Sequence, residues 1–193
     1  MKYLPAGFSL VEVMVALVVI CVGMLGIAKL DALMLSNTST SRIRALVAQE
    51  AASLADSMHA DRDFWDGSSA AWDASAGALT VSATDSAGTT TFTASSAGLS
   101  TALGAGPSCE KGGAVPCSSV NMAAYDLTQW AKALSQVLKN STADVDCADT
   151  SNIVTCTINV QWQENTVAAN SQEGSAGAPA GFQKQNYQLV IQP

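Results

Sequence analysis

GFSLVEVMVALVVICVGMLGIA, residues 7–28, joins an apolar run of membrane length to a single carboxylate near its start. From Phe8 to Ala28 the chain has 21 residues, and Glu12 is the only charged one. At a helical rise of about 1.5 Å per residue this run would be about 32 Å long, close to the roughly 30 Å hydrocarbon layer of a bilayer. Because no A-x-A-like cleavage site follows it, the run predicts a retained membrane anchor and not a signal peptide that is removed.

The charge of Glu12 needs a physical reason. A carboxylate at bilayer depth costs about 2.5–3.5 kcal/mol on insertion scales, so such a residue normally has a partner and a role. The simpler alternative is that the side chain reaches the headgroup layer, because Glu12 lies only four residues past Phe8. The residues that surround Glu12 favour a role over this alternative.

GFSLVE, followed by the apolar run, resembles the prepilin cleavage motif of type IV pilins and their pseudopilin relatives. The resemblance implies a cytoplasmic leader, residues 1–7, that the prepilin peptidase removes by cutting between Gly7 and Phe8. The same membrane-embedded enzyme would methylate the new N-terminus at Phe8. Residues 8–28 would then be the transmembrane and assembly segment.

The resemblance also gives Glu12 a role in setting the register between subunits. When helices pack side by side with an axial stagger, the carboxylate of Glu12 can meet the amine of Phe8 on a neighbouring subunit. Each charge alone is costly in apolar surroundings, and pairing removes most of that penalty only when the subunits are in register.

The orientation of the anchor rests on two opposing signals. Lys29, Arg42 and Arg44 follow the apolar run, and the positive-inside rule alone would keep the downstream residues in the cytoplasm. Four cysteines outside the anchor indicate disulfides and therefore an oxidising compartment. The resemblance resolves the conflict, because family members carry the downstream domain outside the inner membrane. Residues 61–193 are therefore expected to form a periplasmic or extracellular globular domain.

The cysteines outside the anchor form two local pairs, Cys109 with Cys117 and Cys147 with Cys156, whereas Cys21 lies inside the apolar run. Neither pair has the CxxC spacing of a zinc site or a thioredoxin-like site. Four cysteines allow three connectivities. We expect the two local disulfides.

Apolar periodicity predicts an α+β architecture. Ile43, Val47, Leu54 and Met58 recur at helical spacing, so residues 29–60 are expected to be the amphipathic second half of one long N-terminal helix. The resemblance implies a type IV pilin-like fold. In that fold the long helix, membrane-spanning in its first half, packs on a small antiparallel sheet with a second short helix.

The expected elements beyond residue 61 are short. A helix is predicted over residues 123–138, with Asp126 and Gln129 as a capping box at its start. Alternating apolar and β-favouring residues indicate the strands. Strands are predicted at residues 80–84, 89–95, 158–165 and 186–193, and the rest of 67–108 is expected to be loop. The residues between Cys147 and Cys156 are expected to form the turn between two strands.

Composition disfavours several functional classes. The net charge is −7 and the Lys and Arg residues are scattered, whereas nucleic-acid binding needs clustered basic residues. The sole histidine, His59, excludes a multi-histidine metal site. We expect a protein that is not an enzyme, with no metal and no cofactor.

Two groups of residues have a functional and a structural interpretation. Trp65 and Trp72 could stack on a ligand, but we favour a role at the edge of a small core. The acidic groups are expected to be solvated loops and turns, in preference to a catalytic carboxylate pair in the first and a Ca²⁺ site in the second. These groups are Asp61, Asp63 and Asp66, and Asp144, Asp146 and Asp149.

Two looser patterns indicate a subfamily. GMLGIAKLDAL at residues 23–33 and the YDLxxW spacing at residues 125–130 are similar to PilV-type minor pilins. The resemblance implies a structural subunit of the initiation or tip complex of a type IV pilus, supporting adhesion and twitching motility. Expected partners are major pilins, other minor pilins, the prepilin peptidase and a PilY-family tip adhesin.

The same resemblance implies a location and leaves alternatives open. The chain would cross the inner membrane once, with its C-terminal domain in the periplasm, and would then enter the extracellular pilus. One alternative is a pseudopilin of a type II secretion system. Another, from a different class, is a membrane-anchored extracytoplasmic module that binds a ligand.

Overall fold

The computed structural model describes residues 9–67, 69, 72, 78–86, 89–106, 109, 117–150, 153–165 and 182–193. The chain divides into two units, and each is described by itself. Among the described residues, the first unit ends at Thr40 and the second begins at Ser41. The expected leader, residues 1–7, lies outside the described residues, as does Phe8.

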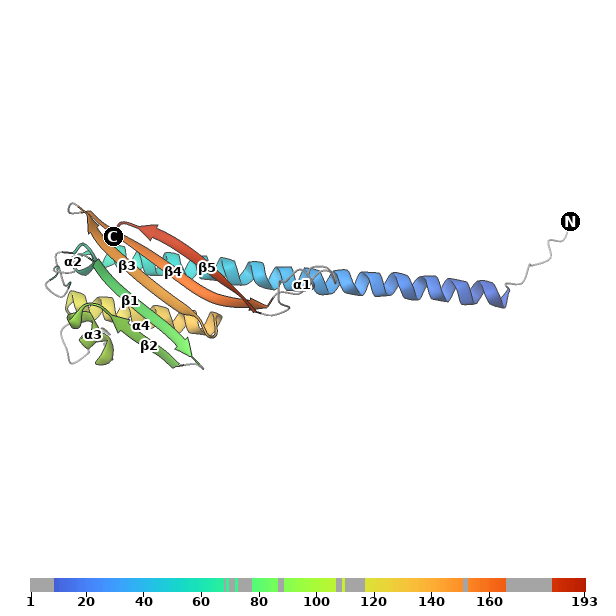
Figure 1. Cartoon of the computed structure of the whole chain (residues 1–193), viewed down its shortest axis with the longest axis horizontal. Coiled ribbons are helices and arrows are strands. Elements are labelled where there is room, and N and C mark those ends of the chain that lie inside the picture. The colour runs from blue at the N-terminus through green and yellow to red at the C-terminus, as the bar shows by residue number, and fades with distance from the viewer. Residues whose placement is uncertain are drawn as a thin grey trace. The chain divides into compact units, whose positions relative to one another are not determined.

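Helix α1, Leu10–Ala60, begins in the apolar run and continues into the globular unit (Figure 1). No proline occurs between these residues, so every backbone N–H past the first turn can donate within the helix. The polar stretch SNTSTS does not interrupt α1, and the Thr38 hydroxyl donates to the carbonyl of Met34 at 2.8 Å. The prediction of one continuous helix is confirmed.

The second unit contains a five-stranded antiparallel sheet with strand order β2-β1-β3-β4-β5. All four predicted strand regions overlap strands of this sheet, and β3 begins before the segment that was expected to be a turn between two strands. The strands are β1 Ala78–Ser86, β2 Thr89–Ala94, β3 Thr142–Thr150, β4 Ile153–Asn165 and β5 Phe182–Ile191.

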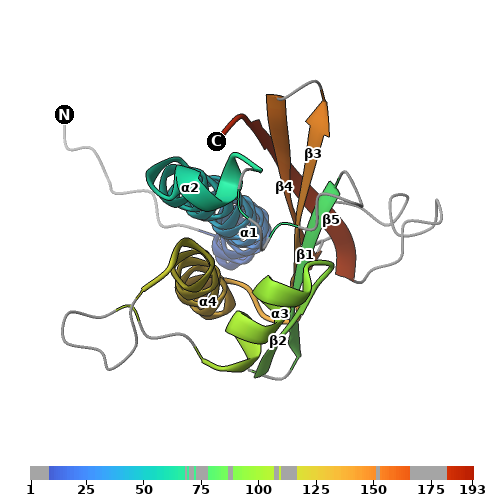
Figure 2. The ribbon, with the colours of Figure 1, turned by 90° about the vertical axis from the view of Figure 1, so that its left-hand side faces the viewer.

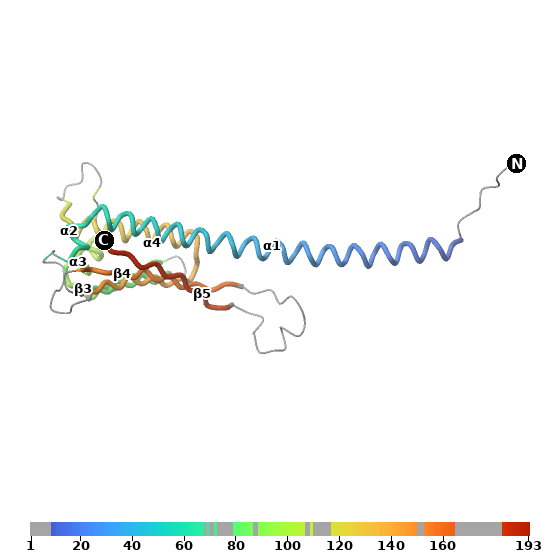
Figure 3. Tube along the Cα trace, turned by 90° about the horizontal axis from the view of Figure 1, so that it is seen from above, coloured from blue at the N-terminus to red at the C-terminus, as the bar shows by residue number. Residues whose placement is uncertain are grey.

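Three further helices complete the second unit: α2 Arg62–Trp65, α3 Ala97–Gly104 and α4 Ser119–Val137. Figures 2 and 3 show α4 beside the C-terminal part of α1, on the same face of the sheet. The expectation that residues 67–108 contain only strands and loop was wrong, because α3 lies there. Its N-terminus is capped by Ser96, whose hydroxyl accepts from the N–H of Leu99 at 3.2 Å.

The predicted capping box of the α4 helix was also wrong. Helix α4 begins earlier, after Ser118, whose hydroxyl accepts from the N–H of Asn121 at 3.4 Å. Ser is a strong N-cap residue, and the apolar stripe extends back to Ala123. Asp126 therefore lies inside α4, where its side chain is near Asp61 and residues of α1.

The core lies between the sheet and the helices α1 and α4. Strand β4 contributes Ile158, Val160 and Trp162, which are at most 4% exposed and alternate with more exposed residues, as the sequence predicted. Helix α1 contributes Val47 and Leu54 among others. The α+β architecture is confirmed, and it is consistent with the pilin fold.

Trp65 and Trp72 belong to this core. They are 1% and 7% exposed, so neither presents an open ring face to a ligand. Phe64 packs against Trp65 edge to face, with ring centroids 5.0 Å apart. Gly67 has φ of +81°, and a Cβ there would lie 2.5 Å from the Trp72 ring. The structure therefore supports the core interpretation of the two tryptophans.

The second unit contains two disulfides, Cys109–Cys117 and Cys147–Cys156. Cys147 and Cys156 lie directly opposite each other on β3 and β4, and both side chains are buried. The bridge therefore lies within paired strands, whereas a turn between strands had been expected to occupy most of this segment. Cys21 is free and exposed on α1.

Candidate functional site

The first described part of α1 presents an almost continuous apolar surface. Apart from the half-buried Leu33, the side chains from Leu10 to Leu35 are exposed, and they include Leu25 at 72% and Leu35 at 73%. α1 is long and apolar enough to cross a membrane. Twenty-six residues span about 39 Å at the helical rise, so this apolar surface continues past the expected end of the anchor at residue 28. Exposing such a surface to water is unfavourable, so we expect lipid or other protein to cover it.

Glu12 lies in the first turn of α1, and its side chain is exposed. Its backbone N–H donates to the carbonyl of Ser9 at 3.0 Å, and the N–H of Val13 donates to the same oxygen at 3.3 Å. This position places the carboxylate near the N-terminal end of the helix, where the backbone dipoles favour a negative charge. Gly7 and Phe8, the expected cleavage and methylation residues, lie outside the described residues.

Gly23 and Gly26 do not interrupt α1. A Cβ built at either position meets no atom within 4 Å. No contact among the described residues therefore requires glycine at these positions. Each glycine lowers helix stability by about 1 kcal/mol relative to alanine.

An ion pair joins α1 to the sheet within the second unit. Arg44 donates from Nε and Nη2 to the two carboxylate oxygens of Glu164, at 3.2 and 2.8 Å. Trp162 Nε1 donates to the same carboxylate at 3.0 Å. These hydrogen bonds from Arg44 are the main reason that the pKa of Glu164 is lowered, and burial opposes them. The pair connects α1 to β4, although the Arg44 side chain remains 54% exposed.

The sequence analysis missed this ion pair. A signal was available, because Glu164 continues the alternation of Ile158, Val160 and Trp162 and therefore falls on the buried face of β4. A buried carboxylate requires a cation or several hydrogen-bond donors. The alternation predicts that a partner exists, but it does not identify Arg44, which is 120 positions away in the chain.

The carboxylates of Asp61, Asp63 and Asp126 lie close together near the C-terminal end of α1, beside α4. Burial raises the pKa of Asp61 to about 6, and the negative charges of Asp126 and Asp63 contribute further. Burial also raises the pKa of Asp126. One carboxylate oxygen of Asp61 is buried and has no hydrogen-bond partner among the described residues. The expectation of a solvated acidic loop is therefore wrong for Asp61.

We expect Asp61→Asn to stabilise the second unit at neutral pH and to have little effect in acid. The folded chain retains a proton that the unfolded chain releases between pH 3.8 and about 6, so the free energy of unfolding falls as pH rises through this window. Allowing for solvent screening of this partly exposed group, the gain at pH 7.5 should be about 1 kcal/mol, and it should vanish near pH 3.5.

Urea unfolding of the full chain in detergent, followed by tryptophan fluorescence at both pH values, measures this difference. Asp56→Asn, on an exposed part of α1, is the control and should show no pH-dependent gain. An equal gain for Asp61→Asn at pH 3.5 and 7.5 would mean that the ionisation of Asp61 is not the cause.

The remaining acidic residues do not form a metal site in the described part of the chain. No group of three or more His, Cys, Asp or Glu side chains suited to a metal ion was found there. The expectation of an acidic turn was wrong, because Asp144, Asp146 and Asp149 all lie on strand β3, where Asp144 accepts from the Ser82 hydroxyl at 2.6 Å. Burial and the charge of Asp144 raise the pKa of Asp146.

Residues 5–28 match the family model described as the prokaryotic N-terminal methylation motif. The matched segment includes Gly7, Phe8 and Glu12. Together with the exposed apolar helix, the match supports a type IV pilin-like protein, pilin or pseudopilin, that is anchored in a membrane by its N-terminal segment. No curated protein and no solved structure matches the chain.

Proposed function

We propose that this chain is a minor pilin, a structural subunit of the initiation or tip complex of a type IV pilus. The observation that carries the proposal is the methylation motif at residues 5–28, which leads into a helix with most of its apolar side chains exposed from Leu10 to Leu35. In the membrane, lipid covers this surface; in a filament, the helices of neighbouring subunits cover it. The protein is a substrate of the prepilin peptidase and has no enzymatic role of its own.

Processing prepares the N-terminus for assembly. The peptidase cuts between Gly7 and Phe8 and methylates Phe8, which leaves a positively charged amine at the start of the helix. Glu12 of one subunit then pairs with this amine on the next. Because neither charge is well solvated in an apolar environment, only the register that pairs them is favourable. Glu12 thus selects one axial stagger between subunits.

The second unit lies outside the inner membrane in this proposal. Two disulfides support that orientation, because disulfides persist in the periplasm and outside the cell but are rare in the cytoplasm. The partners are major pilins, other minor pilins and a PilY-family adhesin at the tip, and the resulting filament serves adhesion and twitching motility. The YDLxxW and GMLGIAKLDAL patterns favour a PilV-type subunit.

A pseudopilin of a type II secretion system is the second candidate, because the methylation motif fits both classes equally. Shearing surface filaments from cells distinguishes them. A minor pilin should co-purify with pili sheared from cells with active prepilin peptidase. It should be absent from the sheared fraction of cells that lack the peptidase. Normal pili in a strain lacking this protein, together with impaired secretion of exported proteins, would instead identify a pseudopilin.

A further inference from the structure

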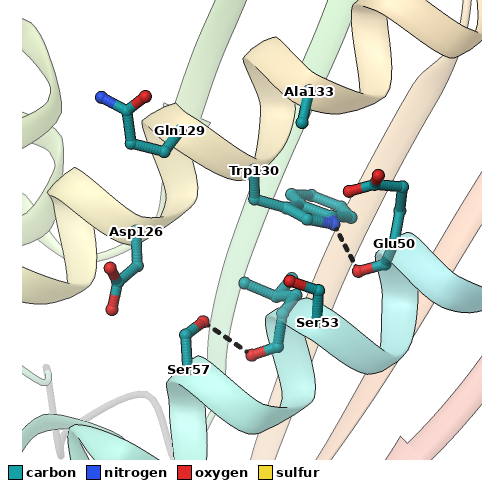
Figure 4. A pocket seen from close by; sticks show the side chains of 8 residues that line it. Glu50, Ser53, Ser57, Asp126, Gln129, Trp130 and Ala133 are labelled. Atoms are coloured by element: carbon teal, nitrogen blue, oxygen red, sulfur yellow. Dashed lines mark hydrogen bonds between the residues drawn. The ribbon is translucent and has the colours of Figure 1, made fainter.

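A groove of about 250 Å³ lies between α1 and α4 in the second unit (Figure 4). Ser53 and Gln129 are exposed at its mouth, and Leu54 and Trp130 are buried beneath it. The groove is partly open to solvent. Its lining residues are Glu50, Ser53, Leu54 and Ser57 from α1, and Asp126, Gln129, Trp130 and Ala133 from α4.

Two hydrogen-bond donors of this groove are occupied by backbone carbonyls of α1. Trp130 Nε1 donates to the carbonyl of Glu50 at 2.9 Å, and the Ser57 hydroxyl donates to the carbonyl of Leu54 at 2.9 Å. The carboxylates of Glu50 and Asp126 remain as acceptors. None of the lining residues is Lys, Arg or His. The groove therefore offers acceptors and negative charge, which a cationic group with several N–H donors complements.

The two carboxylates lie at opposite ends of the groove. Figure 4 shows Asp126 at the end near Ser57, and Glu50 at the end near Ala133. Asp126 and Ala133 are seven residues apart on α4, or about 10 Å along the helix axis. This separation is too long for both carboxylates to hold one metal ion, whose ligands lie about 2–2.6 Å from it. It suits two cationic groups, one at each end.

We propose that the groove between α1 and α4 docks a basic segment of a partner protein, with one Lys or Arg side chain on Asp126 and another on Glu50. The apolar surface of Leu54 and Ala133 between the carboxylates fits the methylene stems of such side chains. An open groove cannot enclose a free small cation, so the backbone of a partner must hold the cationic groups in place. This inference concerns the globular unit and does not depend on the proposed role of Glu12.

Burial supports the need for a positive partner. The pKa of Asp126 is raised by burial, and the charge of Asp126 in turn raises the pKa of the nearby Asp61. No positive charge of the described residues is among the causes of either shift. A cation bound at Asp126 would remove that penalty, so binding should be stronger when the carboxylates are ionised.

The test uses the full chain in a neutral detergent, labelled with 5-fluorotryptophan, and the peptide Ac-Lys-Ala-Ala-Lys-NH₂. In a polyproline II conformation, which has three residues per turn and a rise of about 3.1 Å, the two lysines lie on the same side of the peptide about 9 Å apart. Trp130→Phe assigns the fluorine line of Trp130, which lines the groove. We expect a saturable shift of this line with the lysine peptide and none with Ac-Gln-Ala-Ala-Gln-NH₂.

The variant Glu50→Gln/Asp126→Asn keeps the shape of both side chains and should weaken binding by about tenfold or more, since a charge-assisted hydrogen bond contributes enough for that factor. The matched control, Asp144→Asn/Asp146→Asn on β3, removes the same charge elsewhere and should leave the affinity unchanged. The fluorine spectrum of each free variant reports whether it is folded.

Three results would overturn the inference. The first is no saturable shift of the Trp130 line, and the second is equal affinity of the Glu50→Gln/Asp126→Asn variant. The third is binding of free spermidine as tight as that of the peptide, because a small polyamine would then be the occupant in place of a protein segment.

Discussion

Glu12→Gln should leave the chain processed and anchored in the membrane but remove most of it from surface filaments. The substitution keeps the size of the side chain and removes its charge, so in the proposed assembly the amine of Phe8 on the neighbouring subunit would lose its partner. Breaking a buried charge pair from one side costs about 3–5 kcal/mol. Incorporation should therefore fall by about a hundredfold or more, measured as the amount of chain in sheared filaments relative to membranes.

Ser9→Ala is the matched control, because it changes the residue just before α1, three positions from Glu12, without removing a charge. It should assemble as the unchanged chain does. Mass spectrometry of the N-terminus of both variants establishes that they are processed equally. Normal amounts of the Glu12→Gln variant in filaments would contradict the register role and would favour a carboxylate that only reaches the headgroup layer.

Removal of the Cys147–Cys156 disulfide should have the largest effect on the stability of the second unit. The bridge closes a loop with a sequence separation of 9, which is worth about 2.5–3 kcal/mol in the chain-entropy model. Both side chains are also buried, at 1% and 0% exposed, so Cys147→Ala/Cys156→Ala leaves a cavity as well. We expect a total loss of about 4 kcal/mol in the free energy of unfolding.

Cys109→Ala/Cys117→Ala provides the comparison. Its loop has nearly the same length, with a sequence separation of 8, but Cys109 is half-buried and Cys117 exposed. The loss should therefore be nearer to 2.5 kcal/mol, which is about the entropic part alone. Urea unfolding of the full chain in detergent measures both variants. Equal losses would show that burial of the Cys147–Cys156 bridge adds nothing.

Regular apolar patterns made most of the fold predictable. Helix α1 follows from an apolar run without proline that leads into helical spacing at Val47, Leu54 and Met58. Strand β4 follows from strict alternation through Ile158, Val160 and Trp162. These patterns are local, and each is long enough that packing against the rest of the chain does not override it.

Helix α3 and the start of α4 could not be predicted because their signals are weak or ambiguous. α3 has eight residues, AGLSTALG, and its small side chains give a poor apolar stripe. In α4, both Ser118 and Asp126 are residues suited to an N-cap. Only the packing of Ala123 and Ala124 in the core shows that the helix begins after Ser118.

Of the candidate sites, only the one formed by contiguous residues could be predicted from the sequence. The GFSLVE motif and Glu12 are contiguous in sequence and could be found by inspection, whereas the groove between α1 and α4 joins residues about 75 positions apart, such as Glu50 and Asp126. The contact between Arg44 and Glu164 spans a still longer separation. Such contacts depend on how the helices and sheet pack, and no local pattern specifies the partner.

The central claim is that GFSLVE is a working prepilin motif, and the N-terminal peptide of protein purified from native membranes tests it most directly. Mass spectrometry should find a peptide that begins at Phe8 and carries one added methyl group. A peptide that begins at Met1 or Lys2, in cells with active prepilin peptidase, would contradict the claim. Glu12 would then be a carboxylate that reaches the headgroup layer, and the chain would be a membrane-anchored binding module.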